Sequence, residues 1–460
     1  MTATDTQWQQ GSLIDLTIDS LSDRGDGVGR WQDRVVFVPD SVPQDQVSVR
    51  LLQVKPNYAQ GKIQALQQPS PQRITPACIV ADKCGGCQWQ VVAYGEQLAQ
   101  KQRIVTNALQ RIGGFEIAVE PVMPSAPLSY RNKSTYPLRR SATGQVQTGY
   151  YRKGSHKLVN LNQCPVQDDR LDPLLAGVKQ DIQTQGWSLY DEASGTGALR
   201  HLSLRVGQRT GETLLTLISQ TDVDALPGLE AQAQAWLERF DLAGVCLNIN
   251  QRRTNVIFGT MTRGLAGTPY IAEQFADLTF HIRSATFFQI NTVQAEAMLR
   301  VILDDLDLQG HETIIDAYCG VGTLSLPLAQ RARRVVGVES HAESVAQARY
   351  NAGLNGIDNV SFHAETVEKW LPAHEPETQP DVVVLDPPRR GCAPAVVDAL
   401  VRLRSPRVVY VSCNPATLSR DLKGLCAGGY QLQRVQPIDF FPQTSHVECV
   451  AFLTYGLDGA

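Results

Sequence analysis

The second half of the chain alternates short apolar runs with segments of helical character, from about residue 278 to the last residue. The apolar runs are 313–316, 334–339, 360–362, 381–386 and 407–412. Strands that are almost continuously apolar are buried on both faces, and parallel strands need crossover helices between them. The pattern therefore predicts an α/β domain with a Rossmann-like parallel sheet, which we place at residues 271–460.

Two further domains are expected before this one. Apolar and polar residues alternate over 12–68, around a Gly/Asp-rich turn at 24–29, which predicts a small β-barrel of the OB type at residues 1–70. A Pro-rich stretch at 69–76 then leads into a central domain, residues 71–270. In that domain a helix at 94–111 precedes mostly strands and hairpins.

Overall charge does not indicate a partner, because the net charge is only −4. Residues 130–157 differ: they hold seven Lys or Arg, four Tyr and no Asp or Glu. Cations interleaved with aromatic rings suit single-stranded RNA, although a solvated edge hairpin is the alternative. The chain has no apolar run of 18 residues and no signal-peptide pattern at its start, so we expect a cytoplasmic protein with reduced cysteines.

A glycine turn follows the first apolar run of the α/β domain. The run ending at Asp316 leads into Gly320-Val321-Gly322, and the next run ends in Glu339, 19 residues after Gly320. Such a turn lets backbone approach a ligand, and the second acid can accept hydrogen bonds from both ribose hydroxyls of an adenosine. The third glycine of a dinucleotide fingerprint is missing, which favours S-adenosylmethionine over NAD. A glycine turn that serves packing alone is the alternative.

Covalent chemistry on a base is indicated by Cys413, at the end of the apolar run 407–412, and by Glu448, 35 residues later. A thiolate that adds to C6 of a pyrimidine makes C5 nucleophilic, so C5 can take a methyl group from a sulfonium. A base must then remove the C5 proton so that the thiol leaves. Cys413 and Glu448 suit these two roles. Taken alone, a cytosolic cysteine is more often a small buried hydrophobe, and a late glutamate is more often a surface carboxylate.

Several motifs together resemble those of the RNA 5-methyluridine (uracil-C5) methyltransferase family. They are Asp386-Pro-Pro-Arg-Arg-Gly391, Val408-Val-Tyr-Val-Ser-Cys-Asn-Pro-Ala-Thr417, Phe287-Phe-Gln-Ile-Asn291, Asp316-Ala-Tyr-Cys-Gly-Val-Gly322 and His446-Val-Glu448. The N-terminal unit also resembles that family's TRAM domain. The resemblance implies that Cys413 is the nucleophile and Glu448 the base. It further implies an S-adenosylmethionine site lined by Gln289, Tyr318, Glu339 and Asp386.

Four cysteines form a separate group: Cys78, Cys84, Cys87 and the distant Cys164. Four thiolates suit zinc or an iron–sulfur cluster about equally by chemistry, but zinc sites usually come as two close pairs, and only one is present here. The spacing resembles the four-iron motif of the family's ribosomal-RNA members. That resemblance implies a structural [4Fe-4S] cluster and favours 23S ribosomal RNA over transfer RNA as the substrate.

Three other functions compete with this interpretation. A DNA cytosine-5 methyltransferase shares the thiolate chemistry, but its nucleophile usually follows a proline, whereas Ser412 precedes Cys413. A radical enzyme that cleaves S-adenosylmethionine needs cysteines at gaps of three and two residues, and the gaps here are five and two. A non-enzymatic RNA-binding or assembly factor is disfavoured because the expected site residues are all present. We predict no membrane association and no obligate protein partner.

Overall fold

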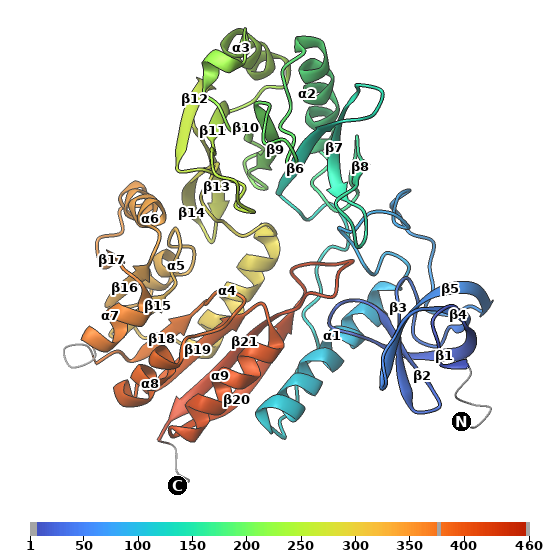
Figure 1. Cartoon of the computed structure of the whole chain (residues 1–460). Coiled ribbons are helices and arrows are strands. Elements are labelled where there is room, and N and C mark those ends of the chain that lie inside the picture. The colour runs from blue at the N-terminus through green and yellow to red at the C-terminus, as the bar shows by residue number, and fades with distance from the viewer. Residues whose placement is uncertain (1–6, 375–378, 457–460) are drawn as a thin grey trace.

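The computed structural model describes residues 7–374 and 379–456, and Figure 1 shows three assemblies of secondary structure. The first is a closed barrel with strand order β1-β2-β3-β5-β4. Its strands are β1 (Leu13–Leu21), β2 (Gly27–Trp31), β3 (Arg34–Val38), β4 (Gln46–Val54) and β5 (Tyr58–Gln68). Alternate apolar side chains of these strands fill the interior, as the period-2 pattern predicts. The expected N-terminal barrel is confirmed.

A mixed seven-stranded sheet forms the second assembly, with strand order β12-β11-β10-β9-β6-β7-β8. Its strands are β6 (Lys133–Arg140), β7 (Val146–Tyr151), β8 (Leu158–Asn160), β9 (Leu199–Val206), β10 (Thr213–Ser219), β11 (Gly244–Ile249) and β12 (Met261–Gly267). Helices α2 (Leu171–Gln185) and α3 (Leu229–Arg239) pack on its apolar face. The hairpin of β13 (Tyr270–Phe275) and β14 (Leu278–Arg283) connects this assembly to the third.

The third assembly is the Rossmann-like sheet, with strand order β17-β16-β15-β18-β19-β21-β20. The strands are β15 (Thr313–Ala317), β16 (Arg334–Glu339), β17 (Val360–Ala364), β18 (Val382–Leu385), β19 (Arg407–Ser412), β20 (Tyr430–Ile438) and β21 (Glu448–Tyr455). The strands from β15 to β19 pair in parallel, as predicted. The last two do not: β21 runs antiparallel to both β19 and β20.

Helices cover both faces of this sheet because its strands are apolar on both sides. One face packs against α4 (Thr292–Leu306), α5 (Ser325–Ala329) and α6 (Ala342–Leu354). The other packs against α7 (Val367–His374), α8 (Pro394–Leu403) and α9 (Pro415–Ala427). The helix expected at 94–111 is α1 (Tyr94–Ala108), followed by a π-helical turn at Leu109–Gly113, and it packs beside α9. Residues far apart in sequence thus build one core.

Candidate active site

The carboxyl ends of the parallel strands meet at one edge of the Rossmann-like sheet, which is where open α/β sheets bind ligands. Glu339 is the last residue of β16, Asp386 follows β18 and Cys413 follows β19. The antiparallel strand β21 brings its first residue to the same edge. Ser412 pairs with Cys449, so the next position along β19 lies beside Glu448. Strand register therefore brings the predicted nucleophile and base together across 35 residues of sequence.

Burial raises the pKa of each acidic group at this edge, and repulsion between neighbouring acids adds to the shift at Cys413 and Glu448. Burial, then the nearby Glu448 and Asp386, raises the pKa of the Cys413 thiol to about 11. The pKa of Asp386 is raised to about 7 by burial alone. Burial, then Asp386, raises the pKa of Glu448 to about 8. Arg389 opposes these shifts at both Cys413 and Glu448, and is a site residue to which we had given no role.

The glycine turn after β15 adopts the backbone that a ligand-binding turn requires. Tyr318, Gly320 and Gly322 all have positive φ, and a Cβ placed on Gly320 would meet open space. Glu339 is tied to this turn, since its Oε2 accepts a hydrogen bond from the Gly320 N–H at 3.3 Å, while Oε1 accepts one from the His341 N–H at 2.8 Å. Backbone and acid are therefore arranged side by side, as an adenosine-binding site needs.

A second acid lies beneath this turn. Asp316 is fully buried and accepts a hydrogen bond of 2.5 Å from the Ser325 hydroxyl. Its other oxygen has no hydrogen-bond partner within residues 7–374 and 379–456, and burial raises its pKa to about 7. The sequence motif contained Asp316, but nothing in the sequence indicated an unsatisfied buried carboxyl. Such a group fits a site that takes up a polar ligand.

The other two predicted cofactor residues lie on different segments. Gln289 lies just before α4, and its backbone oxygen accepts a hydrogen bond of 3.0 Å from the Asn132 side chain of the central domain. Tyr318 donates a hydrogen bond to Glu368 at 3.3 Å, and burial is the main cause that raises its pKa. Tyr318 thus belongs to the glycine turn, while Gln289 joins the Rossmann-like and central domains.

The four predicted cluster ligands line one cavity of about 180 Å³; they are Cys78, Cys84, Cys87 and Cys164. Burial, together with the neighbouring thiols, raises the pKa of Cys87 to about 12 and that of Cys164 to about 11. Within the described ranges, no three His, Cys, Asp or Glu side chains are grouped closely enough to hold a single metal ion. The structure therefore places the four thiols around one cavity but shows no metal site among the residues it describes.

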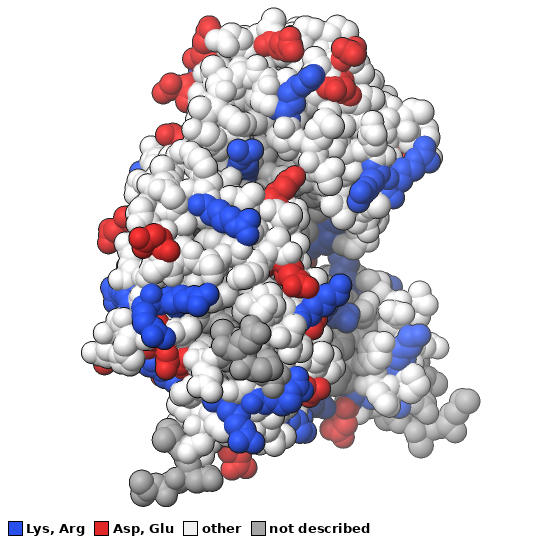
Figure 2. All heavy atoms as spheres, turned by 90° about the vertical axis from the view of Figure 1, so that its left-hand side faces the viewer, with Lys and Arg blue, Asp and Glu red and all other residues white. Residues whose placement is uncertain are grey.

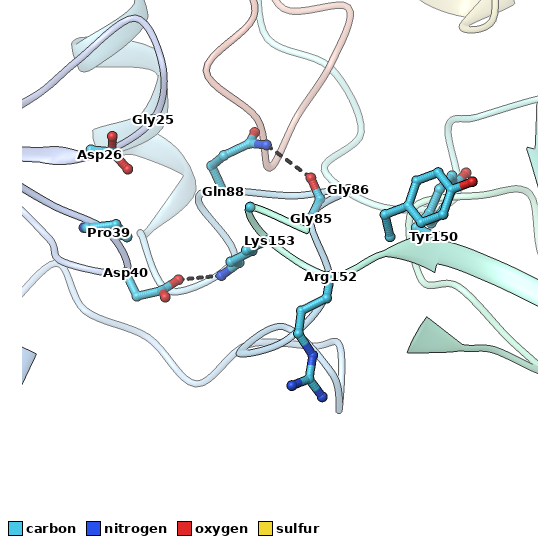
Figure 3. A pocket seen from close by; sticks show the side chains of 12 residues that line it. Gly25, Asp26, Pro39, Asp40, Gly85, Gly86, Gln88, Tyr150, Arg152 and Lys153 are labelled. Atoms are coloured by element: carbon cyan, nitrogen blue, oxygen red, sulfur yellow. Dashed lines mark hydrogen bonds and ion pairs between the residues drawn. The ribbon is translucent and has the colours of Figure 1, made fainter. Parts of the chain in front are cut away.

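The basic, Tyr-rich stretch proves to be only partly a surface feature. Tyr130 and Tyr136 are buried in the protein interior, so they cannot stack on RNA bases, contrary to the sequence-based interpretation. The residues at the end of β7 are accessible. Tyr151, Arg152 and Lys153 line a pocket of about 540 Å³ between the barrel and the cysteine segment, by which we mean residues 78–87. Figure 3 shows Lys153 paired with Asp40 and the Arg152 side chain extending away from this pair.

Surface charge elsewhere is mixed. On the face shown in Figure 2, Lys and Arg alternate with Asp and Glu and do not gather into one basic patch. This agrees with the small net charge of the chain. In the described part of the chain, no helix is long and apolar enough to cross a membrane.

Comparison with known proteins identifies the family. The model of the tRNA (uracil-5-)-methyltransferase family matches residues 93–455, and the TRAM domain model matches residues 7–63. The chain belongs to this methyltransferase family. It is 59% identical over 460 residues to an uncharacterized RNA methyltransferase of Nostoc sp., covering 99% of both chains. It is 39% identical to an uncharacterized RNA methyltransferase of Bacillus cereus, covering 97% of each.

A solved structure agrees with this assignment. The crystal structure of the Pyrococcus abyssi tRNA (uracil-54, C5)-methyltransferase in complex with S-adenosyl-L-homocysteine matches with a TM-score of 0.77 and 29% identity. The match covers 96% of this chain and 100% of that one. The protein is therefore an S-adenosylmethionine-dependent RNA uracil-C5 methyltransferase, and the DNA methyltransferase, radical-enzyme and non-enzymatic interpretations are set aside.

Proposed function

We propose that this enzyme methylates C5 of one specific uridine in 23S ribosomal RNA through a covalent intermediate on Cys413. The observation that carries the proposal is the β19–β21 register, which sets Glu448 beside Cys413 with Asp386 at the neighbouring strand end. A nucleophile and a base must both reach one pyrimidine ring, and this arrangement allows it. The uridine must first be unpaired or flipped, because a stacked base hides C6.

The proposed reaction proceeds in three steps at the uracil: addition, methyl transfer and elimination. The thiolate of Cys413 adds to C6, and the electron pair of the C5–C6 double bond then attacks the methyl group. S-adenosylmethionine supplies that methyl group: its S–CH3 bond breaks, the electron pair stays on sulfur, and the neutral thioether S-adenosylhomocysteine leaves. The carboxylate of Glu448 removes the C5 proton, the C5–C6 double bond forms again, and the C6–S bond breaks to release the thiolate.

Charge decides when each group can act. In the free site both Cys413 and Glu448 hold their protons near neutral pH, because burial raises both pKa values. The guanidinium of Arg389 favours the ionised form of each, so we assign it the role of making thiolate and carboxylate accessible. A cationic sulfonium near Asp386 would act in the same direction.

Recognition of S-adenosylmethionine is proposed for the predicted set Gln289, Tyr318, Glu339 and Asp386. Glu339 would accept hydrogen bonds from the ribose hydroxyls, which its place beside the Gly320 turn supports. The predicted set does not include Asp316. We add Asp316 as a residue that supports the same turn, because one oxygen of its buried carboxyl has no hydrogen-bond partner among the described residues.

The four cysteine thiols are proposed to hold a [4Fe-4S] cluster with a structural role. Their cavity of about 180 Å³ is several times the roughly 30 Å³ of one water molecule in the liquid, so a group of several atoms fits. The Gly86 N–H already points at the Cys84 sulfur at 3.4 Å, and such hydrogen bonds stabilise cluster sulfurs. Cys78, Cys84 and Cys87 precede α1, whereas Cys164 follows β8, so a cluster would join these two parts of the central domain.

RNA binding is proposed at the pocket of Figure 3. Arg152 is exposed, and Tyr151 beside it offers a half-buried ring. Arg139 and Arg140 of the same basic stretch are less available: Arg139 pairs with Glu192, and Arg140 donates to two backbone oxygens. A uridine in transfer RNA is the second candidate substrate, since the solved relative is a tRNA (uracil-54, C5)-methyltransferase.

The test uses purified protein, methyl-labelled S-adenosylmethionine, and ribosomal or transfer RNA that contains 5-fluorouridine. Fluorine at C5 cannot leave as a proton, so a labelled protein–RNA adduct should accumulate and survive a denaturing gel. Adduct with ribosomal RNA that is absent in Cys413→Ala supports the proposal. Adduct with transfer RNA alone would replace the substrate, and no adduct from protein that still binds the cofactor would refute the covalent mechanism.

A further inference from the structure

The loop that connects β20 to β21, residues 439–447, leads directly to Glu448 and is held from several sides. Lys101 of α1 donates to Asp439 at 2.5 Å and to the Phe441 oxygen at 3.0 Å. The Tyr130 hydroxyl donates to the Pro442 oxygen at 3.1 Å, and the Ser445 hydroxyl donates to the Asp23 oxygen at 2.7 Å. The barrel, α1 and the central domain thus all hold this one loop.

Gln443 lies at the centre of these contacts and is itself buried at 6% exposure. Its backbone oxygen accepts hydrogen bonds from the N–H groups of Gln88 and Trp89, both at 3.0 Å. Its side-chain oxygen accepts a hydrogen bond from the Gln97 amide nitrogen at 3.1 Å, and its backbone N–H donates one to the Gln97 amide oxygen at 2.9 Å. Its own amide nitrogen donates to Pro127 at 3.3 Å. One residue therefore ties the loop to three other segments.

The backbone of Gln443 is in the left-handed region, with φ of 69°. A residue with a branched or long side chain rarely adopts this conformation unless surrounding contacts hold it. The strain turns the carbonyl toward the two N–H groups that follow Cys87. The next residue, Thr444, lines the cavity of the four cysteines. These hydrogen bonds thus tie the loop to the segment that follows Cys87.

We infer that Gln443 is a positioning residue, which fixes the 439–447 loop and thereby aims the Glu448 carboxylate at the C5 proton. The inference rests on the proposed covalent mechanism. Only five positions separate Gln443 from Glu448, and β21 begins at Glu448, so no regular structure intervenes to absorb a shift of the loop. Cys413, by contrast, follows a different strand, β19.

A change in the 439–447 loop should affect only the elimination step of the reaction. Addition of the Cys413 thiolate to C6 and methyl transfer to C5 do not need Glu448. Elimination does: the carboxylate takes the C5 proton, the C5–H electron pair restores the double bond, and the C6–S bond breaks. A displaced Glu448 should slow elimination alone, because a misplacement of about 1 Å can cost about a hundredfold in rate. A methylated adduct with ordinary uridine should then accumulate.

The experiment compares the full-length wild type, Gln443→Ala and Gln436→Ala. Gln436 is a matched control, because it is a buried glutamine on β20, outside the loop, whose side chain makes three hydrogen bonds. With ordinary uridine RNA, Gln443→Ala should accumulate labelled adduct and turn over at least about tenfold more slowly. Its rate of adduct formation on 5-fluorouridine RNA should stay within about twofold of the wild-type rate.

Two results would overturn the inference. Equal slowing of adduct formation and turnover in Gln443→Ala would indicate a general structural role, and normal turnover would indicate no role. If Gln443→Ala does not fold, Gln443→Gly replaces it, because glycine adopts positive φ without strain and also removes the side chain. The same two measurements, adduct formation and turnover, then decide the inference in the same way. Failure of the wild type to form any 5-fluorouridine adduct would instead refute the covalent mechanism, so the two failures are distinguishable.

Discussion

The rate at which the methylated adduct breaks down should rise about tenfold between pH 7 and pH 9. Glu448 must be ionised to take the C5 proton, and its pKa is raised to about 8 by burial and by Asp386. At pH 7 about one tenth of the molecules then carry the carboxylate, and at pH 9 about nine tenths do. The sulfonium charge is gone once the methyl group has moved, so it does not lower the pKa at this step.

The assay forms the labelled adduct near pH 6.5, raises the pH by rapid mixing, and follows loss of the protein–RNA band on denaturing gels. Arg389→Gln should move the rise to higher pH, because Arg389 lowers the pKa of Glu448. Arg300→Gln, an exposed position on α4, is the control and should leave the profile in place. A breakdown rate that is flat from pH 6 to 9, or a shift of Arg389→Gln to lower pH, would refute the reasoning.

Four further outcomes are expected. Glu448→Gln should form methylated adduct on ordinary uridine RNA but release product at least about a hundredfold more slowly, as single-turnover gels would measure. Lys101→Met should cost about 3–5 kcal/mol in urea unfolding, because it leaves the fully buried Asp439 without its cation, and adding Asp439→Asn should recover most of that loss. Cys164→Ser should lower the iron and acid-labile sulfide content of anaerobically purified protein, whereas unchanged content would exclude Cys164 as a ligand. Arg152→Glu should weaken RNA binding and reduce the slope of log K against log salt by about one, and an unchanged slope would remove the pocket of Figure 3 from the RNA path.

Much of the fold could be predicted from the sequence because the period of apolar residues is a local signal. The runs that became β15, β16, β18 and β19 are apolar on both faces, and this alone indicates buried parallel strands. The residues at the carboxyl ends of those strands could therefore be placed near one another. The barrel followed from period-2 alternation in the same way.

What the sequence could not provide depends on contacts between distant segments. The insertion of β21 between β19 and β20 sets Glu448 beside Cys413, and no local period encodes that order. Tyr130 and Tyr136 lie in a stretch whose composition suits an exposed RNA-binding surface, yet tertiary packing buries both side chains. The two hydrogen bonds between Gln443 and Gln97 span 346 residues of sequence, so only the folded chain reveals them.

The place of β21 in the sheet also constrains the order in which this enzyme can assemble. β21 follows β20 in sequence but lies between β20 and β19, so β20 has no sheet ladder to join until β21 has been synthesised. The same strand carries Glu448. During translation, the proposed nucleophile Cys413 and the proposed cofactor turn can therefore be in place while the proposed base, Glu448, is still missing. Completion of the sheet and gain of catalytic turnover become a single late event in the biogenesis of the protein.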